Sequence, residues 1–301
     1  MQERGFGLGV WVAYIALVLV WGSAFILIKK ALVVFAPHQL AAIRVTMAFT
    51  FMSFLAVWHL RKVPVKKYIF ILLSGLLGVF IPSFLFPTAQ LHINSSTAGV
   101  INTLSPLFTL SVGVMFFKQK THTRQVMGLL LGLAGAMTLI WKTGASGGLT
   151  LNEYALLAVI ATLCYSFNIN IIKNYLAEVS ALHVSTISLF LIGPLMLVYM
   201  TTIDLRTPIE TNPLAGQALA YILFLALFST TIATVVFNKL IMITNPVFAS
   251  SVTYFIPVVA LFWGILDGES LTWLQGSGIV AIMSGVYLVN APQMKRAVES
   301  S

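Results

Sequence analysis

Aromatic, amide and hydroxyl side chains interrupt the long apolar stretches of this sequence, and binding chemistry would depend on them. Several recur at helical spacing and so share a helix face: Tyr165 with Asn168, Thr231 with Thr234 and Asn238, and Ser251 with Tyr254. In an apolar medium an unpaired amide or hydroxyl is costly, so such groups normally meet protein or water. Each one alone is more often a helix–helix hydrogen bond than a ligand contact.

Together with four further side chains, these residues predict a mixed aromatic and amide lining for a central cavity. The four are Trp21, Phe80, Phe84 and Asn102. The predicted substrate-binding set is Trp21, Phe80, Phe84, Asn102, Tyr165, Asn168, Thr234, Ser251 and Tyr254. Such a lining suits a small amphipathic metabolite better than a bare ion. A phosphate-bearing cargo would call for several arginines at depth, and there is one.

That arginine, Arg44, is the only charged residue more than a helical turn from the end of its span, and it has two interpretations. It either snorkels to the interface or packs between helices, or it faces a wet cavity and contacts a carboxylate. The first interpretation is the commoner one for a single arginine, and Arg44 remains a candidate carboxylate contact. Lys29 and Lys30 end the first span and are predicted to be interfacial anchors.

Prolines give the third candidate feature, a set of kinks or hinges. Pro82, Pro87, Pro106 and Pro257 lie inside apolar spans. Proline has no backbone N–H and bends a helix, which leaves carbonyls in need of partners. A kink needed only for packing is as good an explanation at any single proline. Because the four lie in corresponding parts of the chain, we favour a cavity or hinge.

Catalysis has no residues to support it. The acidic residues and histidines fall at span ends or in loops, so neither paired carboxylates nor a buried Ser-His-Asp set can be assembled. Sequence patterns of metalloproteases, hydrolases and P-loop proteins are absent. Cys164 is the only cysteine, which excludes an internal disulfide and a cysteine-based metal cluster. We therefore expect no enzyme, no metal and no cofactor.

The elements that must position these residues are membrane helices. The sequence is 59% hydrophobic and 8% charged, and a helix needs roughly 20 apolar residues to cross a bilayer. Ten stretches of that kind are predicted, at residues 8–29, 38–60, 67–89, 95–117, 124–142, 153–176, 182–203, 216–241, 246–267 and 273–291. The fold class expected is an all-α membrane protein with ten transmembrane helices.

Charge distribution sets the expected orientation. Most lysines and arginines near span ends fall on the side of the N-terminus, among them Arg61, Lys62, Lys66, Lys67, Lys118, Lys120 and Arg124. Basic loops stay cytoplasmic, so both termini are predicted inside. The net charge of +9 then reflects topology, and we expect no nucleic-acid partner.

The two halves of the chain repeat the same landmarks in the same order. VWGSAFILIKKAL from Val20 aligns with CYSFNINIIKNYL from Cys164, and Pro106 corresponds to Pro257. Five spans in each half place the second half upside-down relative to the first. The predicted units are 1–145 and 146–301, joined by a short flexible link at residues 143–150. Such inverted repeats are typical of alternating access around a central site.

These features resemble the drug/metabolite transporter superfamily, and within it the EamA-type ten-helix exporters, over the whole chain. The resemblance rests on the five-plus-five duplication, Trp21-Gly22, Arg44, Pro106 and a glycine-rich fifth span. It implies transport, most often export of amino acids or related metabolites, across the inner membrane. The small multidrug relatives look to hold a glutamate in the first helix. This chain has none there, so we expect exchange or facilitated diffusion rather than proton antiport.

Other functions stay open. A non-transporting membrane scaffold or sensor is one alternative, and an enzyme acting on lipid-linked substrates is a weaker one. A channel would need a ring of like charges or a carbonyl filter, and neither is present. Gly128, Gly132 and Gly135 with Gly278 and Gly285 predict a close seam between the fifth and tenth spans, or a homodimer surface. The chain is expected to be a monomer or homodimer.

Overall fold

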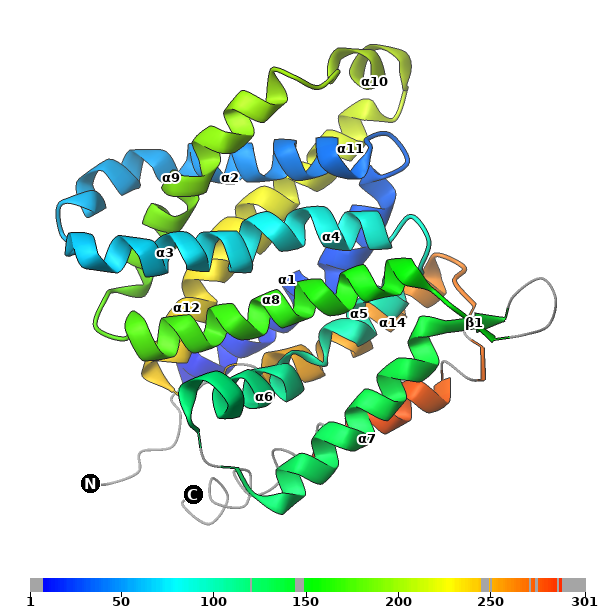
Figure 1. Ribbon diagram of the computed structural model, residues 1–301. Coiled ribbons are helices and arrows are strands. Elements are labelled where there is room, and N and C mark those ends of the chain that lie inside the picture. The colour runs from blue at the N-terminus through cyan, green and yellow to red at the C-terminus, as the bar shows by residue number, and fades with distance from the viewer. Residues whose placement is uncertain are drawn as a thin grey trace.

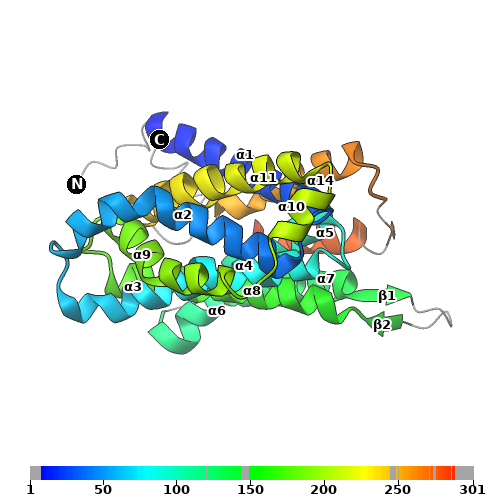
Figure 2. The same ribbon diagram turned by 90° about the horizontal axis from the view of Figure 1, so that it is seen from above.

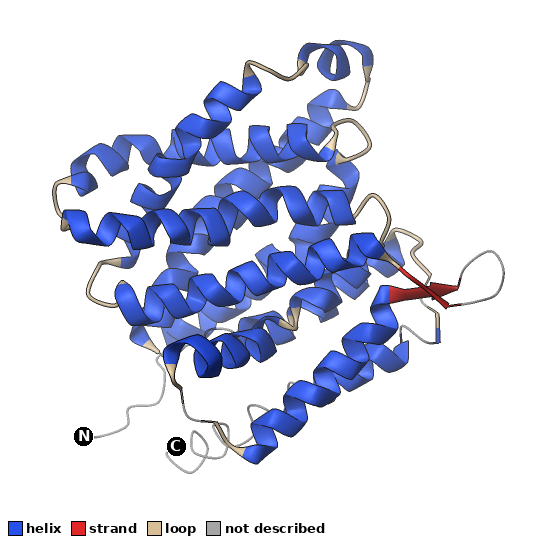
Figure 3. Ribbon diagram, in the orientation of Figure 1, coloured by secondary structure: helices blue, strands red, loops and turns tan. Residues whose placement is uncertain are grey.

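Helices make up nearly all of the structure, a computed structural model (Figure 3). It describes residues 8–119, 121–143, 149–244, 249, 251–270, 272–273, 276–285 and 287–288. The exception is one short antiparallel hairpin of β1 (Trp141–Thr143) and β2 (Leu149–Leu151), with Lys142 opposite Thr150. The all-helical part of the predicted fold class is therefore confirmed for the described chain.

Seven helical segments are long and apolar enough to cross a membrane among the described residues. They are Leu8–Ala31, Pro37–Leu60, Val65–Ala89, Ser95–Phe117, Glu153–Tyr175, Ala181–Met200 and Ala215–Ile243. Each lies within a few residues of a predicted span. Two shorter apolar helices, Val252–Leu266 and Gly276–Gly285, fall in the last two predicted spans.

Four of the seven segments are single helices. These are α1 (Leu8–Ala31), α2 (Pro37–Leu60), α8 (Glu153–Tyr175) and α9 (Ala181–Met200). The fifth predicted span is α7 (Thr123–Ile140), which ends where β1 begins. The predicted flexible link is thus held at both of its ends by the hairpin, while residues 144–148 lie outside the described part.

The remaining spans are interrupted. The third runs through η1 (Val65–Lys67), α3 (Tyr68–Gly75), a π-helical turn η2 (Leu76–Phe80) and α4 (Ile81–Ala89). The fourth divides into α5 (Ser95–Asn102) and α6 (Ser105–Phe117). The eighth comprises α11 (Ala215–Phe224), a π-helical turn η3 (Leu225–Ile232) and α12 (Ala233–Ile243). The ninth has the 3-10 turn η4 (Ser251–Tyr254) before α14 (Ile256–Leu266).

The polar loop after α9 contains a short helix that the sequence did not predict, α10 (Arg206–Thr211). Asp204 starts it, because its Oδ1 accepts hydrogen bonds from the backbone N–H groups of Arg206 (3.0 Å) and Thr207 (3.1 Å). Its side chains are largely exposed, and Arg206 pairs with Glu210 one turn later at 2.6 Å.

The two predicted units interlock. The most extensive packing pairs a helix of the first half with one of the second: α2 with α9, α4 with α8, α6 with α8, and α1 with α14. In Figure 2, α1, α11 and α14 lie on one face of the molecule, and α3, α6 and α8 on the other. Figure 1 shows α8 running between α4 and α6. Any space at the centre is therefore bounded by both halves.

Glycines let α7 approach helix Gly276–Gly285 closely. A Cβ on Gly135 would lie 2.7 Å from the carbonyl oxygen of Gly278 and 2.8 Å from Ala281 Cβ. A Cβ on Gly285 would lie 2.6 Å from the backbone nitrogen of Gly132. The seam predicted between the fifth and tenth spans is thus present within one chain.

Candidate functional site

A cavity of about 110 Å³ lies among helices of both halves. One water molecule needs roughly 10–15 Å³ of such volume, so a small organic solute has room to enter. Its wall comes from α1, α2, η2, α4, α5, α8, η3 and α12, with Ser105 and Thr253 from α6 and η4. The structure brings six of the predicted binding residues to this wall: Trp21, Arg44, Asn102, Tyr165, Asn168 and Thr234.

Aromatic rings form the apolar part of the wall. The Trp21 indole Nε1 donates a hydrogen bond to the Ser229 carbonyl at 3.1 Å, and its ring meets Phe237 edge-on with centroids 4.8 Å apart. Phe86 stacks on Tyr165, with the ring centroids 5.9 Å apart. Edge-on and stacked pairs fix ring orientation beyond simple burial. The cavity therefore offers an ordered aromatic surface rather than a loose apolar one.

Arg44 points inward. Its Nε donates to Thr230 Oγ1 at 2.7 Å, and one terminal nitrogen lies 3.4 Å from Ser229 Oγ. Both partners are neutral, and no carboxylate pairs with Arg44 among the residues that the structure describes. The side chain ends on η3 at the cavity wall, so it packs between α2 and η3 and at the same time faces the cavity.

Three asparagines supply amide groups to the wall. Asn168 Oδ1 accepts a hydrogen bond from Ser74 Oγ at 2.6 Å, which fixes that amide. Asn238 Nδ2 donates to Ser185 Oγ at 2.9 Å, while Asn238 Oδ1 is buried without a partner. Asn102 Oδ1 is likewise buried and unpaired. Two residues of the wall thus each keep a buried side-chain oxygen without a donor from the described part of the chain.

The four predicted prolines share one relation to the cavity. Pro82, Pro87, Pro106 and Pro257 each follow a wall residue by four positions, namely Gly78, Ser83, Asn102 and Thr253. In an α-helix the N–H of a residue donates to the carbonyl four positions earlier, and a proline cannot. A fifth proline inside a helix, Pro194 of α9, follows Phe190, which is not on the wall. The helix interruptions thus coincide with the cavity.

Some predicted residues lie elsewhere. Phe80 and Phe84 pack against the apolar cluster around Met52 and Leu189, and Tyr254 packs against the cluster around α5 and α8. None of these three rings lines the cavity. The side chain of Ser251 lies outside the described residues.

Thr231 is also absent from the wall, and Ser229 and Thr230 take its place. The α-helical spacing assumed for Thr231, Thr234 and Asn238 fails because residues 225–232 form a π-helical turn. In a π-helical turn each hydrogen bond spans five residues instead of four. The turn therefore rotates the side chains before it relative to those after it, compared with a continuous α-helix. No proline or glycine in this segment signals the change.

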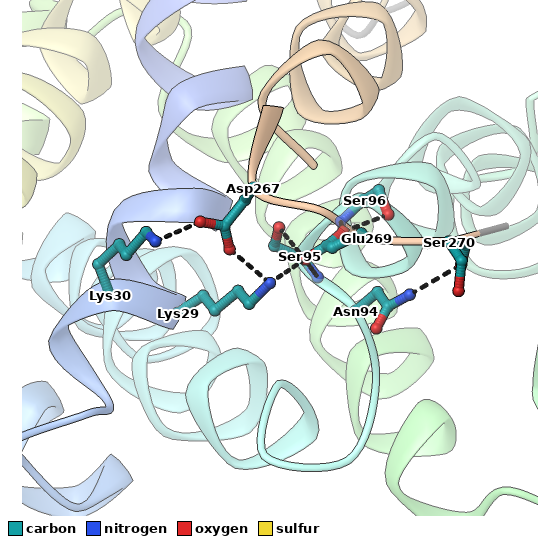
Figure 4. A network of polar contacts seen from close by, with 8 residues as sticks. All are labelled: Lys29, Lys30, Asn94, Ser95, Ser96, Asp267, Glu269 and Ser270. Carbon is teal, nitrogen blue, oxygen red and sulfur yellow. Dashed lines mark hydrogen bonds and ion pairs between the residues drawn. The ribbon is translucent and has the colours of Figure 1, made fainter. Parts of the chain in front are cut away.

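A second polar cluster joins the ends of α1, α5 and α14, and we call it the end network (Figure 4). Lys29 Nζ contacts Asp267 Oδ2 at 2.7 Å and Glu269 Oε1 at 2.8 Å, and Lys30 also pairs with Asp267. Lys29 and Lys30, predicted as interfacial anchors at the end of the first span, thus both pair with carboxylates, which the sequence did not indicate. For Glu269, the sequence indicates only a place in a loop.

Glu269 caps the start of α5. Its Oε1 accepts from the backbone N–H of Ser95 at 3.0 Å and from Ser95 Oγ at 2.8 Å. Its Oε2 accepts from the N–H of Ser96 at 3.1 Å and from Ser96 Oγ at 2.6 Å. A carboxylate at a helix N-terminus meets unpaired N–H groups and the positive end of the helix dipole. The end network therefore binds both halves of the chain together.

Electrostatics keep both acids of the end network ionised. Burial alone would raise the pKa of Glu269, but hydrogen bonds from Lys29, Ser96 and Ser95 lower it to about 2. Hydrogen bonds from Lys29 and Lys30 lower the pKa of Asp267. Neither acid can take up a proton near neutral pH while these contacts last.

No group of three or more histidine, cysteine, aspartate or glutamate side chains suited to a metal occurs in the described ranges. The cavity wall holds one cation and no acidic residue. Its chemistry is that of recognition: a guanidinium, amides, hydroxyls and rings.

Comparison with known proteins gives a consistent result along the chain. The family model described as the EamA-like transporter family matches residues 7–141 and again 152–291. The chain is 27% identical over 281 residues to a protein of Escherichia coli named "Uncharacterized inner membrane transporter YedA", covering 92% of this chain and 89% of that protein.

Two other relatives carry substrate names. One, from Salmonella typhimurium, is named "Probable amino-acid metabolite efflux pump" and is 26% identical over 291 residues (90% and 91% of the two chains). Another is the S-adenosylmethionine/S-adenosylhomocysteine transporter of Chlamydia trachomatis, 25% identical over 263 residues (83% and 80%). A solved crystal structure has the same fold, with a TM-score of 0.65 at 17% identity over 97% of this chain and 99% of that one.

Proposed function

Because this chain belongs to the EamA-like transporter family, we propose that it is a secondary transporter of a small organic metabolite. An amino acid or related compound is the proposed cargo, and export across the inner membrane is the proposed direction. The relatives named as an inner membrane transporter and an amino-acid metabolite efflux pump support both points. The observation that carries the proposal is a polar and aromatic cavity whose wall comes from both halves of the chain.

The helix packing supports an inverted repeat of five plus five helices. If the halves are related by a two-fold axis, each contact must recur with its partners exchanged. The α1–α14 contact has such a counterpart in α8–α6, and α3–α8 has one in α11–α1. The α2–α9 pair is its own counterpart, as is the seam of α7 with helix Gly276–Gly285. This symmetry suits alternating access, in which the halves exchange conformations about a fixed site.

The two ends of the cavity differ in chemistry. Toward the end of α1 that carries Lys29, the end network joins α1, α5 and α14. Toward the other end, Leu17, Ile172 and Leu240 belong to a buried apolar cluster. We propose that the end network is the closure on the side opposite the termini, and that it breaks when the cavity opens there.

Exchange or facilitated diffusion is the proposed transport mode. A proton-coupled carrier needs a group at the site that gains and loses a proton during the cycle. The wall carries no carboxylate or histidine among its described residues. The acids of the end network are held ionised by their lysines.

Counterflow in liposomes tests the proposed function. Purified protein is reconstituted with an excess of one unlabelled amino acid inside and traces of the labelled compound outside, with and without a pH gradient. We expect transient accumulation of label for one class of amino acid, unchanged by the gradient. Folded protein that accumulates no compound would favour the scaffold or sensor instead. Accumulation that requires the gradient would contradict the exchange mode alone.

A further inference from the structure

Resting on the proposed function, we infer that the cavity selects its cargo by the carboxylate, which binds Arg44, and that it accepts the cargo's ammonium on uncharged oxygens. The site then takes zwitterions best, tolerates carboxylates without an amine, and rejects amines without a carboxylate.

The guanidinium of Arg44 has no counter-ion in the described part of the chain. Its hydrogen-bond partners are the hydroxyls of Thr230 and Ser229, and it ends at a wall with no acidic residue. Removing a cation from water is costly unless an anion and further hydrogen bonds compensate it. An arginine can offer two parallel N–H groups to one carboxylate. A cargo carboxylate would supply the missing negative charge.

Two side-chain amides are the groups that we assign to the ammonium of the cargo. Asn102 and Asn238 line the same cavity, with 6% and 2% of their surface exposed, and each keeps an unpaired side-chain oxygen. Buried acceptors without a donor are uncommon in native structures and cost free energy. An ammonium group offers three N–H donors. Neutral acceptors can satisfy it without the strong attraction that a carboxylate would add.

The aromatic wall by itself would suit a different cargo. Rings such as Trp21, Phe86 and Phe237 can hold an organic cation through their π faces. The fixed positive charge of Arg44 in the same cavity repels such a cation, since little water separates the charges. Arg44 therefore determines whether the cavity binds carboxylates or organic cations, and replacing Arg44 should allow organic cations to bind.

The experiment uses three amino acids, each with two truncated analogues. Leucine is compared with 4-methylpentanoate and 3-methylbutylamine, phenylalanine with 3-phenylpropanoate and 2-phenylethylamine, and methionine with 4-(methylthio)butanoate and 3-(methylthio)propylamine. Binding is measured as thermal stabilisation of the purified full-length protein, and the same compounds compete in counterflow. We expect the order amino acid, then carboxylate, then amine in at least one triad.

Variants locate the effect. Arg44→Gln should weaken amino-acid and carboxylate binding by about tenfold or more, the range of a lost charged hydrogen bond, and should leave amines bound equally or better. Arg44→Lys should retain part of the carboxylate binding. Arg206→Gln is the matched control, because Arg206 is exposed on α10 and pairs only with Glu210 in the described chain. It should behave as the wild type.

Three results would overturn the inference: amines that bind as well as carboxylates, carboxylate binding that survives Arg44→Gln, or no stabilisation by any carboxylate in the panel. Failure of the proposed function looks different. In that case carboxylates would bind in an Arg44-dependent way, but no compound would show counterflow. The inference about binding selectivity would then still hold.

Discussion

Among single residues, Trp21 makes the clearest contribution to the cavity wall. Its indole donates a hydrogen bond to η3 and packs edge-on against Phe237 of α12. We predict that Trp21→Ala lowers counterflow at least tenfold, because it removes apolar surface from the cavity wall and the hydrogen bond to the Ser229 carbonyl. Trp21→Phe should keep the ring contact and lose only a few-fold, since a neutral hydrogen bond contributes about 1 kcal/mol. Counterflow rates at equal protein density check this.

Trp273 is the matched control for Trp21, because 96% of its surface is exposed. Trp273→Ala should leave the rate unchanged. Equal losses in Trp21→Ala and Trp273→Ala would remove the special role given to Trp21.

Gly78 gives a second prediction, based on close approach. A Cβ there would lie 2.5 Å from Asn168 Nδ2, so Gly78→Ala must displace the amide that Ser74 fixes. A glycine-to-alanine change inside a helix normally stabilises it by about 1 kcal/mol. We expect the opposite at Gly78, with a lower melting temperature and several-fold weaker cargo binding.

Gly216 of α11 is the matched control for Gly78, because a Cβ at this position would meet nothing within 4 Å. Gly216→Ala should therefore raise the melting temperature or leave it unchanged. A Gly78→Ala protein that is as stable and binds as well as Gly216→Ala would show that Asn168 is not held at this spacing.

Some residues of the cavity wall could be predicted from the sequence, and others could not. Trp21, Asn102 and Asn168 are polar or amphipathic groups at mid-span, and the cost of burying them predicted a cavity position without knowledge of the fold. Phe80 and Phe84 carry no such cost, so their apolar rings could pack anywhere, and they pack in a core. Ser229 and Thr230 needed the π-helical turn of η3, which composition does not signal.

At the scale of elements, the end network makes the most direct prediction. Glu269 has 3% of its side chain exposed and receives Lys29 and the α5 N-terminus at once. Glu269→Gln keeps the size and removes the charge, and we expect it to lower stability by roughly 2 kcal/mol, the range of charged hydrogen bonds. Thermal unfolding in detergent measures the change.

Glu210→Gln is the control for that loss, because Glu210 forms an exposed pair with Arg206. Exposed pairs contribute about 0–1 kcal/mol, so its melting temperature should barely move. Equal effects of the two substitutions would mean that the end network adds no more than a surface pair.

The pH dependence of the Glu269→Gln effect follows from the pKa. The folded protein holds the pKa of Glu269 at about 2, below its ordinary 4.5. The unfolded chain therefore binds the proton first as pH falls, and the stabilisation is present above about pH 5 and lost toward pH 2. The stability difference between wild type and Glu269→Gln should shrink over that window. A difference that is constant from neutral to acid pH would contradict the role of the charge.

Span positions were predictable because about 20 apolar residues are a strong signal, and α1, α2, α8 and α9 begin and end within a few residues of prediction. The contacts between spans could not be predicted in this way. Lys29 and Glu269 are 240 residues apart, and charges at span ends look alike whether they face lipid or each other. The hairpin after α7 was missed for a similar reason, since three-residue strands are too short to show alternation.

At the scale of the whole molecule, the glycines of α7 test whether this helix packs inside one chain or against a second copy. A side chain on Gly132 would collide with Leu107 of α6, inside the same chain. Gly132→Leu should therefore reduce the yield of folded protein. Gly276→Leu, with nothing within 4 Å, should not. Normal folding of Gly132→Leu with dissociated dimers would place this surface between two chains.

Alternating access to one cavity is the central claim, and cysteine accessibility tests it most directly. Cys164 is the only cysteine, so Cys164→Ser gives a background in which Ala24→Cys places one thiol on the wall. Right-side-out and inside-out membrane vesicles are treated with a membrane-impermeant thiol reagent, with and without transported amino acid. Alternating access predicts labelling from both sides, slowed by the amino acid. Labelling from one side only, whatever the amino acid present, would contradict it.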